Sequence, residues 1–418
     1  MIKERIEDRM SRESYDSYLF PSGFRLIHYP KKDRFLKAAF LSVGFGSTDL
    51  KGQYRGQDFS LPEGVAHFLE HKLFEGEEDL FDRMTRLGAS VNAFTSHDLT
   101  CYYFTSPINF KESLDLLLQI PINPQYTREG IEREKDIISH EIKMYQDDID
   151  YATFHRGLEY LYPQHPVGRD IAGSVGSIEG INKEVLDFAV KCYYVPSKML
   201  LFLIGDFSEA EIASYIEGLP SFYIEKREVA KSLFVEDKSV TGHKRLKQYQ
   251  NIPSSNFSYL VKLEPGLDKE KAFEESIYYT IFLDIIFGEA SDFYRKHYER
   301  GDFSDFSASY SYGSGYSLLS FSGEGRAPFL IEEALAELLK QPNRIDREKE
   351  TRVKRRLMGR YLMGFNSLEG IASNFTFLYH RGINMFDYLP LMEKTRLNGR
   401  DSLFDGASCF SVTMKESL

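Results

Sequence analysis

The stretch GVAHFLEHKLFEG (64–76) contains two histidines four residues apart, with a glutamate directly before the second histidine. Residues four apart on a helix project from one face with Cβ atoms about 5–6 Å apart, so His67 and His71 can hold one metal ion. Glu70 lies on nearly the same face, where its carboxylate can reach a metal-bound water. Catalytic zinc typically keeps a water beside its protein ligands, and a nearby carboxylate can accept a proton from that water. The pattern alone leaves two interpretations open: a zinc helix with Glu70 as general base, or ordinary core histidines.

The composition of the whole chain is that of a globular protein. The chain has 418 residues, 42% of them hydrophobic and 28% charged, which predicts two or three domains. Its net charge of −11 disfavours binding to nucleic acid or to an anionic membrane. The longest apolar run, IYYTIFLDIIF (277–287), is too short to span a bilayer. With no secretory signal and only three widely spaced cysteines, we expect reduced thiols and a cytoplasmic location.

Periodicity predicts alternating strands and helices on both sides of the zinc helix, which we expect to run from Pro62 to Gly76. In the first half, strands are expected at 24–29, 37–45, 89–96, 99–106 and 198–205, and helices at 79–88, 111–120, 128–147 and 182–192. In the second half, strands are expected at 256–263, 304–312 and 316–324, and helices at 270–287, 327–340, 346–364, 367–379 and 382–395. The order of elements repeats, and on that order alone we infer a tandem duplication of one α+β unit.

A polar, aperiodic segment separates the two halves. Residues 219–242, LPSFYIEKREVAKSLFVEDKSVTG, have the character of a linker. We therefore expect a metal-bearing domain at 1–218 and a second domain without metal at 243–418.

The zinc-helix stretch resembles the G-x-A-H-x-L-E-H-x-x-F-x-G segment of the M16 metallopeptidases, the family of pitrilysin, insulin-degrading enzyme and mitochondrial processing peptidase. The resemblance implies two tandem homologous units of the processing-peptidase type, each a mostly antiparallel sheet with helices packed on it. It also implies one zinc ion per chain, with His67 and His71 as ligands and Glu70 as the catalytic base.

A later acidic helix carries two glutamates that the same resemblance singles out. The stretch EREKDIISHEIKMYQDD (132–148) contains Glu134 and Glu141, seven residues or about two helical turns apart. Members of the family have a third zinc ligand at the second of these positions, preceded by another glutamate seven residues earlier. The resemblance therefore implies that Glu141 is a ligand and that Glu134 orients the site from behind it. A solvated acidic face is the ordinary interpretation of either glutamate.

A third stretch, GASVNAFTSHDLTCYYFTS (88–106), resembles the strand pair that lies beside the zinc helix in the family. There an N-A-x-T strand binds the substrate backbone in extended form by β-augmentation. The resemblance implies that Asn92, Ala93 and Phe94 contact a peptide substrate. An ordinary sheet strand would have the same pattern, so both interpretations stay open.

The second half departs from the family at one place. Active members close a chamber from four such units, and an arginine and a tyrosine near an R-G turn stabilise the oxyanion. The nearest stretch here, YRKHYERGDFSDF (294–306), places His297 and Ser304 at those two positions when Arg300 and Gly301 form the turn. The resemblance thus implies a partner, either a homologous M16 subunit or a second copy of the chain.

These patterns lead to a function hypothesis with two alternatives. We expect a zinc-dependent peptidase that hydrolyses peptide bonds of peptides or small unfolded proteins, as the catalytic subunit of a heterodimer. The alternatives are a non-proteolytic assembly or structural subunit, and a maturation factor for one dedicated protein. The intact H-x-x-E-H with both downstream glutamates favours the enzyme. Together with HPVGRDIAGSVGSI (165–178), the motifs are similar to the paired cytoplasmic M16 proteins of Gram-positive bacteria linked to modification of elongation factor P.

Overall fold

A computed structural model describes residues 1–74, 79–122, 124–233, 243–250, 254–265, 268–340, 345–397 and 409–416. The chain forms two compact units, each assembled from three stretches of sequence. Unit 1 comprises Met1–Ile142, Asp170–Leu233 and Leu362–Phe386, and unit 2 comprises Lys143–Arg169, Phe234–Tyr361 and Asp387–Leu418. The domain limits at 218 and 243 stay a prediction about homologous halves, and residues 234–242 of the expected linker lie outside the described residues.

Unit 1 is built on a seven-stranded sheet with the order β1-β2-β3-β9-β4-β8-β7. Only the β3–β9 pair is parallel, and the other neighbours are antiparallel. A small sheet of order β10-β5-β6 lies in the same unit. The strands are β1 (Ile2–Glu7), β2 (Ser14–Leu19), β3 (Arg25–Pro30), β4 (Lys37–Val43), β5 (Lys51–Tyr54), β6 (Gln57–Ser60), β7 (Ser90–Thr95), β8 (Thr100–Ser106), β9 (Met199–Gly205) and β10 (Lys231–Ser232).

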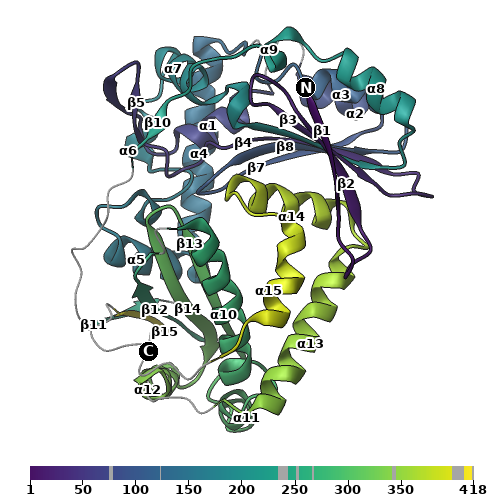
Figure 1. Ribbon diagram of the computed structural model, residues 1–418. Helices are drawn as coiled ribbons and strands as arrows, with labels where there is room; N and C mark the ends of the chain where they lie inside the picture. The colour runs from purple at the N-terminus through teal and green to yellow at the C-terminus, as the bar shows by residue number, and fades with distance from the viewer. Residues whose placement is uncertain are drawn as a thin grey trace. The chain divides into compact units, whose positions relative to one another are not determined.

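Helices cover both faces of the large sheet. Helix α1 contacts β7 and β8, whereas α14 contacts β4 and β9 (Figure 1). Successive residues of a strand point to opposite faces of the sheet. In β9, the ring of Phe202 contacts the ring of Phe375 of α14, whereas its neighbour Leu201 packs into the main core on the other face. The helices of unit 1 are α1 (Val65–Lys72), α2 (Leu80–Arg86), α3 (Phe110–Leu117), most of α4 (Arg128–Asp147), α6 (Val175–Ile178), α7 (Lys183–Tyr193), α8 (Glu209–Glu217), α9 (Ser221–Ile224) and α14 (Leu368–His380).

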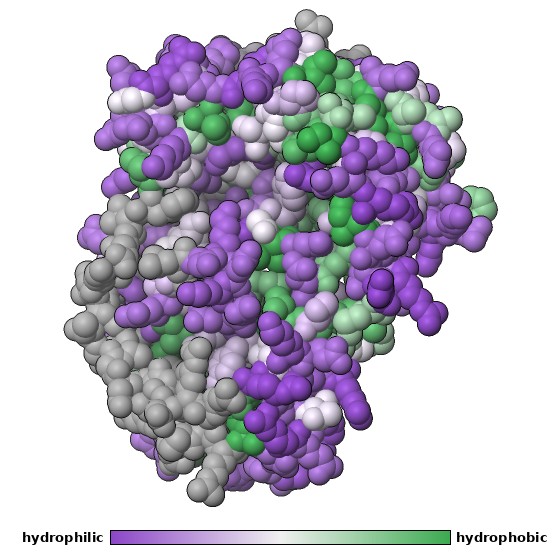
Figure 2. All heavy atoms as spheres, viewed as in Figure 1, coloured by the Kyte–Doolittle hydropathy of each residue, from purple (hydrophilic) through white to green (hydrophobic). Residues whose placement is uncertain are grey.

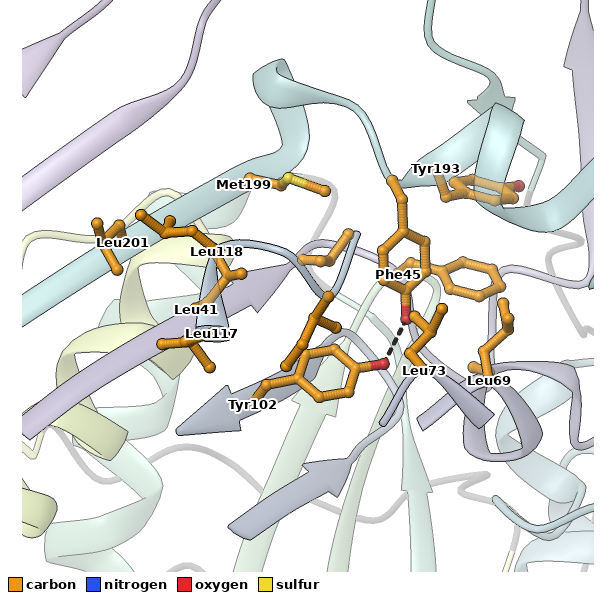
Figure 3. Close-up of a cluster of buried hydrophobic side chains, with 14 of the residues drawn as sticks. Leu41, Phe45, Leu69, Leu73, Tyr102, Leu117, Leu118, Tyr193, Met199 and Leu201 are labelled. Atoms are coloured by element: carbon orange, nitrogen blue, oxygen red, sulfur yellow. Dashed lines mark hydrogen bonds between the residues drawn. The ribbon is translucent and has the colours of Figure 1, made fainter. Parts of the chain in front are cut away.

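The main core of unit 1 holds α1 in place. Leu69 of α1 and Leu73 just after it pack into the same buried cluster as Leu41 of β4 and Leu201 of β9 (Figure 3). The buried Tyr102 hydroxyl pairs with the hydroxyl of Tyr194 at 2.9 Å, which satisfies both polar groups inside the core. The apolar positions of α1 therefore face this core.

Unit 2 repeats the sheet of unit 1 without its first two strands. Its order β11-β15-β12-β14-β13 corresponds to β3-β9-β4-β8-β7, and the only parallel pair, β11–β15, falls at the same place. The prediction of two homologous, mostly antiparallel α+β units is therefore confirmed. The strands are β11 (His243–Gln250), β12 (Ser255–Leu263), β13 (Asp305–Gly313), β14 (Tyr316–Gly325) and β15 (Cys409–Glu416).

Each unit contains a helix from the other half of the sequence. Helix α5, from the first half, contacts β12 and β15 of unit 2, and α14, from the second half, contacts β4 and β9 of unit 1. Arg381, just after α14, bonds Asp98 at 3.0 Å, and His380 bonds Ser42 at 2.8 Å. The helices of unit 2 are α5 (Ile149–Leu161), α10 (Lys269–Phe287), α11 (Asp292–Glu299), α12 (Pro328–Lys340), most of α13 (Arg347–Gly364) and α15 (Tyr388–Lys394).

Several helix limits differ from the expected ones, and α1 begins at Val65 rather than at Pro62. The helix expected at 382–395 begins only at Tyr388, because Gly382 adopts a left-handed φ of 77° that interrupts the chain after α14. Helix α1 ends at Lys72, and the expected stop at Gly76 lies outside the described residues.

The surface and the cysteines complete the description. Across the described residues, no helix combines the length and apolar character that crossing a bilayer requires. The face drawn in Figure 2 is mainly hydrophilic, with scattered apolar patches. Cys101, Cys192 and Cys409 are all buried, and none of the three forms a disulfide.

Candidate metal centre

The start of α1 depends on a close approach between two backbone segments. Gly64, the residue before the helix, has a left-handed φ of 87°. A Cβ atom built at Gly64 would lie 2.3 Å from the carbonyl oxygen of Ala172. A side chain at this position would therefore strain the turn and push α1 away from the segment around Ala172. The glycine of the stretch thus fixes where the helix begins.

Three of the residues singled out in the sequence converge between α1 and α4. His67, His71 and Glu141 each offer one ligand atom, and these atoms lie within 4.8 Å of one another. The Nε2 atoms of His67 and His71 are each 3.7 Å from a carboxylate oxygen of Glu141. These distances are too long for hydrogen bonds. The three side chains are nevertheless close enough to bind one ion with one atom each.

Glu134 lies behind this cluster and binds the far side of one histidine. Its Oε1 is 2.9 Å from Nδ1 of His71, and its Oε2 accepts a hydrogen bond from Nζ of Lys72 at 3.3 Å. Since Nδ1 of His71 is engaged by Glu134, the Nε2 atom of the same ring is directed toward Glu141.

The two histidines have opposite electrostatic surroundings. Burial, reinforced by the nearby His71, lowers the pKa of His67 to about 3, so this imidazole is neutral. Burial also opposes a charge on His71, but the hydrogen bond and the charge of Glu134 outweigh it and raise the pKa of His71. Burial likewise acts to raise the pKa of Glu134, and its contacts with His71 and Lys72 overcome this and lower it.

The cluster fits a zinc ion by its donor chemistry. Two imidazole nitrogens and one carboxylate oxygen form a donor set typical of catalytic zinc sites. His67 is 9% exposed, and its Nδ1 has no hydrogen-bond partner among the described residues, so no hydrogen bond at Nδ1 stabilises a charged ring. Neutral imidazole is the form that binds metal. His67, His71 and Glu141 are thus the residues that would hold the ion.

Glu70 is oriented by a residue of the neighbouring strand. The hydroxyl of Thr95, the last residue of β7, donates a hydrogen bond of 2.5 Å to Oε2 of Glu70. Burial raises the pKa of Glu70, although the Thr95 hydrogen bond and the charge of His71 act against the shift. A carboxylate held in this way, beside the three candidate ligands, is placed to accept and return a proton.

The predicted substrate strand, β7, forms one edge of the large sheet. Strand alternation places Ala93 on the same face as Thr95, and places Asn92 and Phe94 on the opposite face. Phe94 stacks on Phe377 of α14, with ring centroids 5.4 Å apart. The backbone N–H of Ala93 donates to Oδ1 of Asn92 at 2.8 Å. Of the three expected contact residues, the structure therefore brings only Ala93 to the face where Glu70 lies.

Both halves of the chain match family models of known proteins. Residues 58–175 match the model of insulinase, peptidase family M16, and residues 180–356 match that of the peptidase M16 inactive domain. YmfH, an uncharacterized zinc protease of Bacillus subtilis, is 31% identical over 406 residues, which cover 95% of this chain and 94% of that protein. The chain belongs to peptidase family M16.

Solved structures share the fold of this M16 chain. An M16-like peptidase from Alicyclobacillus acidocaldarius superposes with a TM-score of 0.89 at 26% identity, covering 100% of this chain and 99% of that one. A protease from Helicobacter pylori gives a TM-score of 0.79 at 15% identity over 96% of this chain and 100% of that one, which shows a common fold alone. The resemblance to the M16 metallopeptidases inferred from the motifs is confirmed.

The two residues that the sequence alignment placed at the oxyanion positions form other contacts in unit 2. His297 is buried on α11, and its Nδ1 is 2.7 Å from Oδ2 of Asp302. The Ser304 hydroxyl donates to the backbone carbonyl of Glu324 at 3.1 Å. Gly301 has a φ of 68°, so the expected turn is present at this place. Both side chains stabilise the turn locally.

Sequence reasoning missed two residues of this M16 site. Thr95 belongs to the N-A-x-T segment already singled out for its backbone, and that pattern was a signal for the hydroxyl as well. Lys72 directly follows the second histidine, and a lysine on a helix is usually exposed. Here the Lys72 side chain is completely buried, which no sequence pattern indicated.

Proposed function

We propose that the chain is a zinc-dependent peptidase that hydrolyses peptide bonds in peptides or small unfolded proteins. The observation that carries this proposal is the convergence of His67, His71 and Glu141 beside the buried carboxylate of Glu70. Relatives of the chain are named zinc proteases, which agrees with this chemistry.

The roles of the residues follow from their positions. His67, His71 and Glu141 hold the metal, and Glu134 keeps the His71 ring turned so that Nε2 faces the other ligands. A zinc ion bound there acts as a Lewis acid toward water and a peptide carbonyl. Glu70 accepts the proton of the attacking water and returns it to the departing amine, while Thr95 holds its carboxylate in place.

The open edge of β7 is the proposed docking place for the substrate backbone. A peptide that adds a strand to this edge gains backbone hydrogen bonds regardless of its sequence. Ala93, on the face shared with Thr95, would lie beside the reacting bond, whereas Asn92 and Phe94 would contribute through their backbone. This arrangement suits extended or unfolded segments better than folded proteins.

A homologous partner is part of the proposal. By the resemblance to the family, His297 and Ser304 stand in place of its arginine and tyrosine, and they contact Asp302 and the Glu324 carbonyl respectively. An M16 partner subunit, or a second copy of the chain, would supply the missing oxyanion donors. Mixing the chain with a homologous M16 subunit should raise peptide cleavage by at least about tenfold, because one oxyanion donor is typically worth roughly 10²–10³ in turnover.

Zinc analysis and peptide cleavage together test the proposal. We expect about one zinc ion per chain by elemental analysis, and less in His67→Ala, His71→Ala or Glu141→Gln, each of which removes one of three protein ligands. Light scattering should show a complex of two chains when the partner is added. A metal-free wild-type chain, or one that holds zinc but cleaves no unstructured peptide with any homologous partner, would favour a non-proteolytic subunit instead.

A further inference from the structure

A completely buried lysine lies directly beside the proposed metal ligands. Lys72, the last residue of α1, has 0% side-chain exposure. Its Nζ donates to the carbonyl oxygen of Gly130 at 3.0 Å and to Oε2 of Glu134 at 3.3 Å. Burying an ammonium group is costly unless it is paired and hydrogen-bonded, so a lysine retained here needs partners of this kind.

Glu134 connects this lysine to a proposed ligand. One carboxylate oxygen contacts Nζ of Lys72, and the other contacts Nδ1 of His71. Glu134 is itself only 8% exposed, so water has little access to replace a lost partner. Without the lysine, Oε2 would lose this charged donor, and the carboxylate would be freer to rotate away from His71.

Lys72 also joins the two helices that carry the ligands. Lys72 is on α1 with His67 and His71, while Gly130 and Glu134 are one turn apart on α4, which also carries Glu141. The two contacts of Nζ therefore tie the end of α1 to the first turns of α4. This contact thus lies between the two helices that supply the proposed ligands.

We propose that Lys72 is a positioning residue of the metal centre, which holds Glu134 in the orientation that directs His71 toward the metal. The inference rests on the proposed zinc function and adds a residue to it. Lys72 is not one of the proposed ligands, and it acts on the metal centre through its contact with Glu134. Residues that orient metal ligands from behind typically change metal affinity or activity by about 10- to 100-fold when replaced.

Zinc affinity, measured by competition with a chelator, tests this role without measuring catalysis. Lys72→Met keeps the unbranched apolar part of the side chain and removes only its donor. We expect zinc binding about tenfold weaker than in the wild-type chain. Lys72→Gln retains an N–H donor but carries no charge, and it should also lower zinc affinity. This variant replaces Lys72→Met in the test if Lys72→Met does not fold.

A double-mutant cycle separates positioning from general destabilisation. If Lys72 acts through Glu134, Lys72→Met should weaken zinc binding little further in a Glu134→Gln background. Losses that simply add would mean that the two residues act independently, which would overturn the proposal.

Lys354 provides a matched control in unit 2. It is 6% exposed, and its Nζ contacts Glu350 on the same helix, α13, at 2.9 Å. Lys354→Met removes a lysine that is also buried but lies far in sequence from any proposed ligand, and it should leave zinc affinity unchanged. An equal loss in Lys354→Met and Lys72→Met would reveal a general effect on folding and would overturn the proposal.

The wild-type measurement distinguishes the two levels of inference. A wild-type chain that binds no zinc would refute the proposed function, and with it the role of Lys72. A wild-type chain that binds zinc, together with a folded Lys72→Met variant of unchanged affinity, would refute the positioning role alone.

Discussion

The two units share a scaffold but differ in the chemistry that it carries. By their order around the matching strands, α1, β7 and α4 of unit 1 correspond to α10, β13 and α13 of unit 2. In unit 1 the two helices supply His67, His71 and Glu141, and β7 supplies Thr95, which bonds Glu70. In unit 2 the same three elements line a cavity of about 370 Å³.

The side chains in the cavity of unit 2 are of another kind. Helix α10 presents Thr280 and Asp284, four residues apart like the two histidines of α1, and Asp284 forms an ion pair with Arg356 of α13. In the described part of the chain, a cluster able to hold a metal is found only in unit 1. A protein cation thus lies between the two helices of unit 2 that correspond to the helices of the candidate metal site, as expected when different side chains are added to one fold.

The largest effect that tests this difference concerns the proposed base. Glu70→Gln keeps the size of the side chain but cannot accept a proton, so peptide cleavage should fall by about 10²–10⁴-fold while zinc stays bound. The matched variant, Glu289→Gln at the cavity of unit 2, should leave cleavage almost unchanged. Initial rates and zinc content measure both. If the Glu70→Gln variant cleaved peptides at a near-normal rate, Glu70 would be excluded as the base.

The next effect concerns the exchanged helices. Phe375 of α14 is 5% exposed and contacts the rings of Tyr15 and Phe202 in unit 1. Phe375→Ala should reduce the free energy of unfolding of unit 1 by about 3–5 kcal/mol, through lost burial and a cavity. Zinc release during urea unfolding reports on unit 1, and it should occur at lower urea than in the wild type.

A matched variant in unit 2 sharpens this test. Leu158 of α5 is 4% exposed in the core of unit 2, and Leu158→Ala should cost about 2–5 kcal/mol there. If the units unfold separately, the urea midpoint of zinc release should stay near that of the wild type. Equal shifts in the two variants would mean that both units unfold as one cooperative system.

The exchange of helices also marks a limit of sequence analysis. The apolar periodicity of 367–379 correctly predicts a helix, now α14, but a helix of this kind can cover the sheet of either half. The choice depends on contacts between residues distant in sequence, such as Phe375 with Phe202. Strand β1, IKERIE, was missed for another reason, because its mostly exposed charged residues give no apolar pattern.

The candidate site was more predictable than the packing around it. Spacing along α1 and α4 placed His67, His71, Glu134 and Glu141 on the proper helix faces, since helical periodicity is a local property. Burial of Lys72 depends instead on the approach of two helices, so its sequence position did not indicate it.

A smaller effect is expected where unit 1 supports its ligands indirectly. Glu134→Gln keeps a polar side chain behind His71 but removes the charge, so zinc affinity should fall by about 10- to 100-fold. Chelator competition measures the change. Glu132 is an exposed glutamate on the same helix, and it contacts Lys135. If Glu132→Gln weakened zinc binding as much as Glu134→Gln, the total negative charge of α4 would matter more than the contact with His71.

The smallest effect is expected at the ion pair in the cavity of unit 2. Arg356→Gln removes the cation that contacts Asp284, a partly exposed pair whose loss should cost about 1 kcal/mol or less. Zinc content should not change, because none of the proposed ligands belongs to unit 2. Elemental analysis and urea unfolding of the variant check both expectations. If Arg356→Gln lost its zinc while remaining folded, zinc binding would depend on unit 2 as well as on unit 1. The proposed difference, a metal in one unit and a protein cation in the other, would then be wrong.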